Sequence, residues 1–215
     1  MNEEYRIDEC GVIHQVNYEK FNYNNEYINT YRSFGSSQDM LSHLRLGYLA
    51  GAMKRMPRSI IDVGYGDGNF LKTCLKAGIK AYGADITGVE VPEGAHFIDD
   101  FINCGRHFDA ISFFDSLEHF EDMNFIDKLD VNYLIISVPC APTRDISSSE
   151  FIDWRHRKPN EHLHHFDLMS LRSFMLGKGY FFKALSNPED MIRRDDSVDI
   201  NIITGVFQKG SRANG

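Results

Sequence analysis

Short apolar runs alternate with segments of helical spacing from residue 59 onward, and this alternation is the most regular pattern in the chain. Each run is bounded by glycine, proline or charged residues, which is typical of a buried strand. Strands are predicted at 59–63, 80–85, 95–99, 108–114 and 132–139. Helical spacing predicts helices between them at 70–77 and 117–129. Strands and helices in this order predict a parallel sheet that is covered on both faces.

The segments before this alternating core have a different pattern. Residues 1–35 hold five of the ten tyrosines and show no sustained period, so we expect an irregular arm. Apolar residues at helical spacing then predict a helix that begins at Ser36 or Ser37 and continues to Met56, where Pro57 stops it.

The last third of the chain begins with a polar stretch. Residues 141–165 show no strong period, which predicts a long loop of about 25 residues. A helix is predicted at 168–177, followed by strands at 180–186 and 199–207 with a charged loop between them. We expect these two strands to form an antiparallel closing pair.

The length of 215 residues fits one domain, 1–215. Within it we expect an N-terminal arm and helix, a core and a polar tail, at 1–57, 58–209 and 210–215.

Composition and charge narrow the classes of function. Hydrophobic residues make up 42% and charged residues 25%, as in ordinary globular proteins. The net charge of −8 is opposite to that of most nucleic-acid-binding domains. No run reaches the roughly 18 apolar residues of a membrane helix, and the acidic start is unlike a signal peptide. We therefore expect a cytoplasmic protein and disfavour nucleic-acid and membrane partners.

The clearest candidate for a ligand site is the glycine-rich segment that follows the first core strand. Gly64, Gly66 and Gly68 stand between a predicted strand and a predicted helix, where backbone N–H groups can face an anion. Asn69 stands where a dinucleotide fingerprint has its third glycine, which weakens a nicotinamide or flavin interpretation. A tight turn without a ligand is the alternative.

A carboxylate at the end of the second strand favours a ligand site over a tight turn without a ligand. Asp85 lies 21 residues after Gly64, where an acidic side chain can accept hydrogen bonds from ribose hydroxyls. Together with the glycines, it predicts a nucleoside ligand with an unmodified ribose.

These motifs resemble, in order, those of the class I S-adenosylmethionine-dependent methyltransferases, and more narrowly those acting on small molecules and sugars. The resemblance covers residues 59–182. It implies a Rossmann-like, doubly wound α/β sheet of seven mostly parallel strands with an antiparallel closing strand. S-adenosylmethionine is the implied cofactor, and S-adenosylhomocysteine its product. The implied cofactor-binding residues are Asp62, Gly64, Tyr65, Gly66, Gly68, Asp85, Ile86, Asp99, Asp100, Phe101, Asp115 and Ser116.

Three histidines are the candidate catalytic residues. His119 belongs to a segment that is similar to a Leu-Glu-His signature of the family, and His162 and His164 match its histidine-bearing loop. A histidine can act as general base when a hydroxyl or an amine accepts the methyl group. The alternatives are local packing of His119 and a polar loop that only covers the site.

A metal site built from the histidine-rich loop is a third possibility. The available ligands would be His156, His162, His164, His165, Glu161 and Asp167. No metal is expected, because these residues lack the spacing of helical or cysteine-containing metal motifs.

The resemblance therefore implies O- or N-methylation of a small-molecule or glycan acceptor. Tyr27 and Tyr31 of the arm are candidates for a lid over the cofactor, with surface packing as the alternative. Two other functions stay open: a non-catalytic cofactor-binding or interaction module on the same fold, and a methyltransferase that acts on RNA or protein.

Overall fold

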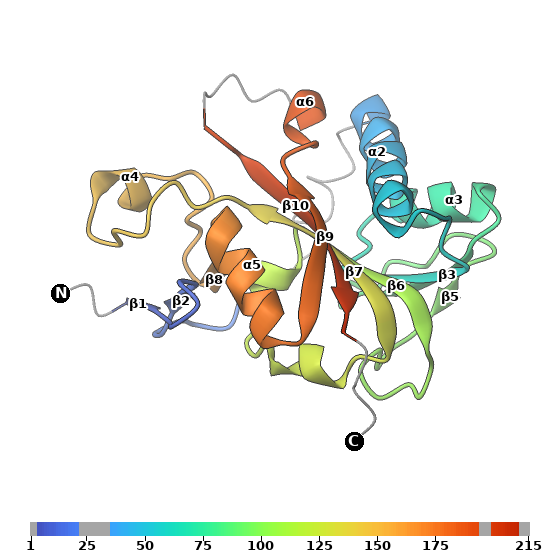
Figure 1. Cartoon of the computed structure of the whole chain (residues 1–215), viewed down its shortest axis with the longest axis horizontal. Helices are drawn as coiled ribbons and strands as arrows, with labels where there is room; N and C mark the ends of the chain where they lie inside the picture. Colours follow the sequence, from blue (N-terminus) through green and yellow to red (C-terminus); the bar gives the residue numbers. More distant parts are fainter. Residues whose placement is uncertain (1–3, 22–34, 194–198, 211–215) are drawn as a thin grey trace.

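The computed structural model describes residues 4–21, 35–193 and 199–210, which form a central seven-stranded sheet in the order β5-β4-β3-β6-β7-β10-β9 (Figure 1). The strands are β3 (Ser59–Val63), β4 (Lys80–Ala84), β5 (His96–Phe97), β6 (Phe108–Phe114), β7 (Val131–Pro139), β9 (Tyr180–Ser186) and β10 (Ile202–Lys209). Strands β3 to β7 pair in parallel, whereas β10 is antiparallel to both β7 and β9. The predicted sheet, with its antiparallel closing strand, is confirmed.

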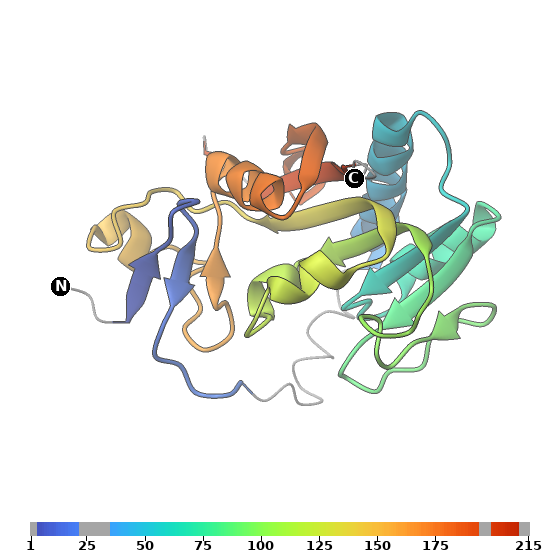
Figure 2. The same ribbon diagram turned by 60° about the horizontal axis from the view of Figure 1, so that its bottom comes forward.

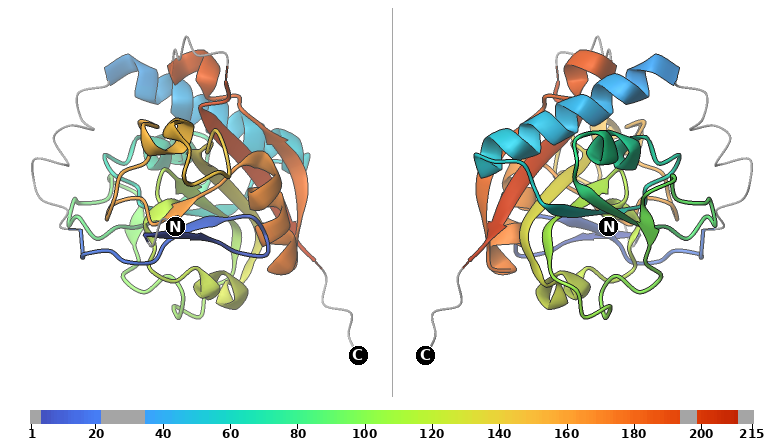
Figure 3. Two further views of the ribbon diagram at one scale, coloured as in Figure 1. Left: turned by 90° about the vertical axis from the view of Figure 1, so that its left-hand side faces the viewer. Right: turned by 90° about the vertical axis from the view of Figure 1, so that its right-hand side faces the viewer.

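Helices cover both faces of the sheet because successive strand residues point to opposite sides. Ile60 of β3 packs with α2 (Gly35–Met53) and α3 (Asn69–Lys76), which lie on one face (Figure 3). Ile61 packs on the other face, with α5 (Leu168–Gly177) and the segment that follows β6. Because both faces of the sheet are covered, the strand segments are mostly apolar instead of alternating between apolar and polar residues.

Two predicted helices differ from the structure. The helix expected to reach Met56 ends at Met53, because Lys54 has a φ of 58° and so leaves the helical conformation. Instead of one helix at 117–129 there are two short 3-10 helices, Leu117–His119 and Asn124–Lys128. An extended Phe120 separates them, and its ring packs against that of Phe125.

The arm expected to be irregular instead forms part of a second, three-stranded sheet (Figure 2). β1 (Tyr5–Ile7) and β2 (Ile13–Gln15) form a hairpin, and β2 also pairs with β8 (His164–His165) of the predicted long loop. Strands of two or three residues are too short to show a period, which is why the sequence pattern missed them. Tyr27 and Tyr31 lie outside the described residues.

The predicted loops also contain short helices. α4 (Ser149–Ile152) lies within the stretch after β7, beside the small sheet. α6 (Asp190–Arg193) lies within the charged segment that joins β9 to β10.

One carboxylate joins three core elements at the amino ends of the strands. Asp109 of β6 accepts two hydrogen bonds from the Arg55 guanidinium, at 2.9 and 3.0 Å, and one from the backbone N–H of Arg58. The Asn132 side chain of β7 donates a fourth, at 3.1 Å. The Arg55 hydrogen bonds outweigh the effect of partial burial and lower the pKa of Asp109 to about 2. This carboxylate therefore ties the end of α2 to β6 and β7.

We expect Asp109→Asn to lower the free energy of unfolding by about 1–2 kcal/mol at pH 7. Because the pKa of about 2 lies below the ordinary 3.8, the loss should shrink as the pH falls from 4 toward 2. Urea denaturation across this range measures both effects. Asp130→Asn is the matched control, since Asp130 pairs with His107 at an exposed site and should change stability little. An equal loss in both variants would contradict this assignment.

Candidate functional site

The carboxyl ends of β3, β4 and β6 meet at one edge of the sheet. β3 lies between the other two, so the connections that leave its neighbours run to opposite sides. Ligands of open parallel sheets bind in the crevice at such a switch point. The glycine loop, defined as residues 64–68, leaves β3 at this edge and leads into α3.

The glycines of this loop serve different purposes. All three have positive φ, between 56° and 80°. A Cβ at Gly64 would lie 2.7 Å from Cβ of Ser116, and one at Gly68 would lie 2.7 Å from Cγ of Pro92. Gly66 has no atom within 4 Å of the corresponding position. Packing therefore requires Gly64 and Gly68, whereas Gly66 faces open space in which a ligand can approach the backbone.

Asp85 is placed beside this opening. One carboxylate oxygen accepts the Gly66 N–H at 2.9 Å, and the other accepts the Thr87 N–H at 2.8 Å. The carboxylate thus joins the end of β4 to the glycine loop, as the spacing to Gly64 predicts. The adjacent Ile86 is 81% exposed and offers an apolar surface at the same edge.

The Tyr65 side chain, predicted to bind cofactor, lies in the core. Its ring packs beside Gly83, where an added Cβ would lie 2.6 Å from the ring, and its hydroxyl donates to the carbonyl of Val89. This packing anchors the middle of the loop to β4 and the segment that follows.

Asp62 lies at the base of the loop, inside β3. Its side chain is buried and accepts a hydrogen bond of 2.7 Å from the Ser112 hydroxyl of β6. Burial raises the pKa of Asp62 to about 7, although the Ser112 hydrogen bond and the charge of Arg45 oppose this shift. A buried carboxyl that titrates near neutrality beside a glycine loop is typical of functional sites.

Three of the residues that the resemblance implies for cofactor binding, Asp99, Asp100 and Phe101, follow β5. Asp100 accepts hydrogen bonds from the backbone N–H groups of Ile102 and Asn103 and so stabilises a turn. Asp99 is exposed, and Phe101 packs edge-on against the ring of Phe113. The structure brings these residues to the edge of the sheet beyond β4.

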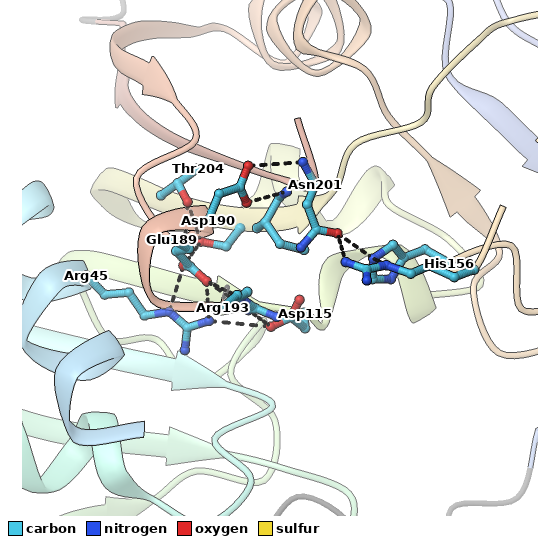
Figure 4. Close-up of polar contacts among 11 residues, drawn as sticks. Arg45, Asp115, His156, Glu189, Asp190, Arg193, Asn201 and Thr204 are labelled. Atoms are coloured by element: carbon cyan, nitrogen blue, oxygen red, sulfur yellow. Dashed lines mark hydrogen bonds and ion pairs between the residues drawn. The ribbon is translucent and has the colours of Figure 1, made fainter. Parts of the chain in front are cut away.

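Asp115 and Ser116 lie where the chain turns away from β6. Asp115 has a φ of 51° and pairs with two guanidinium groups, those of Arg45 and Arg193 (Figure 4). The Ser116 hydroxyl donates to the carbonyl of Val63 at 2.7 Å, so this turn is held against the start of the glycine loop.

Both arginines also bind Glu189, a fully buried residue in the segment that the sequence predicts as a charged loop. Arg45 donates two hydrogen bonds to it, at 2.8 and 2.9 Å, and Ser137 of β7 donates another at 2.6 Å. Burial disfavours the charged form, but Arg45 and Arg193 prevail and lower the pKa of Glu189 to about 2. Sequence spacing gives no signal for the contacts of Glu189 with Arg45 and Ser137, which lie 144 and 52 positions away, whereas Arg193 lies only four positions after Glu189.

A second set of contacts links α6 to the loop after β7 (Figure 4). The carboxylate of Asp190 accepts the backbone N–H groups of Asn201 and Ile202, at 3.1 and 2.9 Å. The side-chain oxygen of Asn201 in turn accepts a hydrogen bond of 2.8 Å from His156. The histidine-rich loop is therefore attached to the elements that hold Asp115.

His119 and His162 lie together, 43 residues apart in sequence. Their ring centroids are 4.7 Å apart. Nδ1 of His119 lies 2.8 Å from the carbonyl oxygen of Glu161, so Nδ1 carries the hydrogen and the basic lone pair is at Nε2. Burial lowers the pKa of His119, and burial with the neighbouring His119 lowers that of His162 to about 2. Both side chains are therefore neutral at physiological pH.

Glu118 joins this pair, although the sequence singles it out only as part of a signature. Its side chain is 1% exposed, and burial and the negative charge of Asp115 raise its pKa well above the usual range. Its position directly after β6 is the signal that could have identified it.

His164 has a different environment from the other two candidates. Nε2 donates to the carbonyl of Phe120 at 2.7 Å, and Nδ1 lies 2.8 Å from Nδ1 of His14 in β2. His14 in turn bonds to Asp8 at 2.9 Å. Both ring nitrogens of His164 are thus engaged within the fold, where they connect the small sheet to the segment after β6.

The sequence matches a known family over most of its length. The family described as "Methyltransferase domain" matches residues 40–181. No curated protein sequence matches significantly.

Several solved structures share the fold. The plantazolicin methyltransferase BpumL is 14% identical with a TM-score of 0.59, and the match covers 86% of this chain and 90% of BpumL. Magnesium protoporphyrin IX methyltransferase from Synechocystis PCC 6803 is 15% identical with a TM-score of 0.58, at coverages of 90% and 91%. The 1,6-didemethyltoxoflavin-N1-methyltransferase of Burkholderia thailandensis is 13% identical with a TM-score of 0.58, at coverages of 97% and 100%. All three were crystallised with S-adenosylhomocysteine.

None of the described helices is both long and apolar enough to span a membrane.

The raised pKa of the buried Asp62 carboxyl can be tested through the pH dependence of stability. Because its pKa of about 7 lies above the ordinary 3.8, ionisation should cost stability as the pH rises between these values. We expect Asp62→Asn to raise the free energy of unfolding by about 1–2 kcal/mol at pH 8, and by less at pH 5. Urea denaturation at the two pH values measures the difference. A gain that is larger at pH 5 would contradict a raised pKa.

Proposed function

Because the chain belongs to the class I S-adenosylmethionine-dependent methyltransferases, we propose that it methylates an oxygen or nitrogen atom of a small-molecule or sugar acceptor. The observation that carries the proposal is the opening at Gly66, which lies beside Asp85 at the carboxyl edge of β3 and β4. A cytoplasmic site of action is part of the proposal, and the four cysteines, all unpaired, fit a reducing compartment.

The residues around this opening fit the parts of S-adenosylmethionine. The backbone at Gly66 can approach the methionine end, since nothing in the described structure fills the space above it. Asp85 has a second lone pair on each oxygen with which to accept the ribose hydroxyls. Ile86, Asp99 and Phe101 line the adenine side of the proposed site, and Asp100 shapes the turn between them.

Bound S-adenosylmethionine supplies an activated methyl group, so the protein needs mainly to position the acceptor and exclude water. Asp115 and Ser116 form the boundary between the cofactor and acceptor sides in this proposal. The paired arginines that hold Asp115 keep this boundary rigid.

His119 and His162 are the residues we propose to face the acceptor. The basic Nε2 of His119 can accept a proton or a hydrogen bond, given the hydrogen at Nδ1. We assign His164 a supporting role instead, because both of its nitrogens bond within the fold.

A small acceptor is supported by two observations. The names of the similar structures describe methylation of a natural product, a porphyrin and a toxoflavin precursor. The net charge of −8 disfavours an RNA acceptor.

We expect Gly66→Val to weaken S-adenosylhomocysteine binding at least about 100-fold, equivalent to about 2.8 kcal/mol. A valine would occupy the open space and would also be strained at a φ of 56°. Isothermal titration of the folded chain measures the affinity.

Gly78→Val is the matched control for that experiment. Gly78 has a φ of 76° with no atom within 4 Å of an added Cβ, but it lies at the opposite end of β4. This variant should be destabilised by similar backbone strain and still bind S-adenosylhomocysteine like the wild type. Absence of binding by the wild-type chain, or equal affinity in Gly66→Val, would refute the proposed cofactor site.

A further inference from the structure

Glu118, His119 and His162 converge beyond the carboxyl end of β6. One potential ligand atom from each side chain lies within 4.8 Å of those from the other two. Glu118 is 1% exposed and His162 is 5% exposed, whereas His119 is partly exposed, so the group can be reached from solvent on the His119 side. The three side chains come from two segments that the small sheet and the first 3-10 helix bring together.

Hydrogen bonding within the fold does not account for this arrangement. In the part of the chain that the structure describes, both carboxylate oxygens of Glu118 and Nδ1 of His162 are buried without a hydrogen-bond partner. A buried polar group in that condition destabilises the fold, because its lost hydrogen bonds to water are not replaced. Asp115 adds a repulsive negative charge near Glu118, which the charges of Arg193 and Lys158 oppose less strongly. A cation bound between these side chains would remove both penalties.

The orientation of His119 fits a metal ligand. Its Nδ1–H donates to the Glu161 carbonyl, which directs the lone pair of the opposite nitrogen away from that carbonyl. Ligating histidines in proteins are commonly oriented by such a hydrogen bond from the second nitrogen.

We propose that Glu118, His119 and His162 bind a divalent transition-metal ion. Two imidazole nitrogens and one carboxylate oxygen suit zinc, iron, cobalt or manganese, whereas magnesium and calcium prefer an all-oxygen set. The sequence gives no signal for this set, because Glu118 and His119 lie more than 40 residues before His162. Three protein ligands leave at least one coordination position for an exogenous oxygen atom.

The metal site also indicates the chemical class of the acceptor. This second part of the inference rests on the proposed function. Ser116, two residues before Glu118, lies against Gly64 at the start of the glycine loop, so a bound metal would lie at the same edge of the sheet as the cofactor opening. A metal acidifies a hydroxyl group that it binds, as it acidifies water. Because Nε2 of His119 would then bind the metal, the acceptor hydroxyl would release its proton to solvent rather than to His119. Its oxygen would form a bond to the methyl carbon while the carbon–sulfur bond breaks and S-adenosylhomocysteine leaves. The favoured acceptor is therefore an alcohol or phenol.

Metal binding is tested with the full chain after treatment with a chelator. We expect one Zn²⁺ per chain by isothermal titration, and visible absorption bands when Co²⁺ is used. Glu118→Gln and His162→Gln should each lower the affinity at least about 100-fold, more than the usual loss for a residue that only orients a ligand. His165→Gln is the matched control, since His165 is equally buried with an unpartnered nitrogen but lies outside the group. It should bind Zn²⁺ like the wild type.

Thermal unfolding distinguishes a lost ligand from a damaged fold. Without metal, Glu118→Gln should unfold at a temperature no lower than the wild type, because it removes a buried carboxyl without partners. Zn²⁺ should raise the unfolding temperature of the wild type and of His165→Gln, but not that of Glu118→Gln. Absence of saturable binding by the wild type, or unchanged affinity in both Glu118→Gln and His162→Gln, would overturn the site.

Two further measurements test the acceptor role and cofactor binding separately from metal binding. Acetohydroxamate should shift the Co²⁺ spectrum by occupying the open position, and an unchanged spectrum would overturn the acceptor role. S-adenosylhomocysteine is titrated into the same samples. Zn²⁺ binding without S-adenosylhomocysteine binding would refute the proposed function alone, and the reverse result would refute the metal site alone.

Discussion

The buried charge of Glu189 is the constraint on which the carboxyl edge of the sheet depends. A carboxylate at a position with no solvent exposure is tolerated only when it is paired and hydrogen-bonded. Arg45 from α2, Arg193 from α6 and Ser137 from β7 meet this requirement together. Because both arginines also pair with Asp115, the same contacts that neutralise Glu189 determine where the chain turns after β6.

The parts of the fold that the sequence predicts well are those with strong local signals. The core strands are apolar on both faces, and Gly64, Gly66 and Gly68 can adopt a conformation that other residues avoid. Asp85 is equally accessible to prediction, because its partner Gly66 lies at a fixed distance along a strand–helix–strand unit. Two strand-like segments joined by a charged loop predict the antiparallel closing pair, which β9 and β10 form.

The missed features depend on contacts between distant segments. β1 and β2 have three residues each, and the pairing of β2 with β8 joins positions about 150 residues apart. Glu189 lies in a segment predicted as a charged loop, yet it is buried, because Arg45 of α2 reaches it from a distant part of the chain and Arg193 pairs with it from four residues away. Glu118 and His162 are likewise brought together by the tertiary fold. No periodicity along the chain encodes such pairings, so only the folded arrangement reveals them.

The small sheet has a consequence for how such a protein can diversify. Strands β1 and β2 support the loop that carries His162, whereas the glycine loop and Asp85 are supported by β3 and β4. If the proposed function holds, the residues that select the acceptor and those that hold the cofactor are supported by separate stretches of chain. Mutations in residues 5–15 and 141–165 could therefore change the acceptor while the cofactor-binding residues stay unchanged.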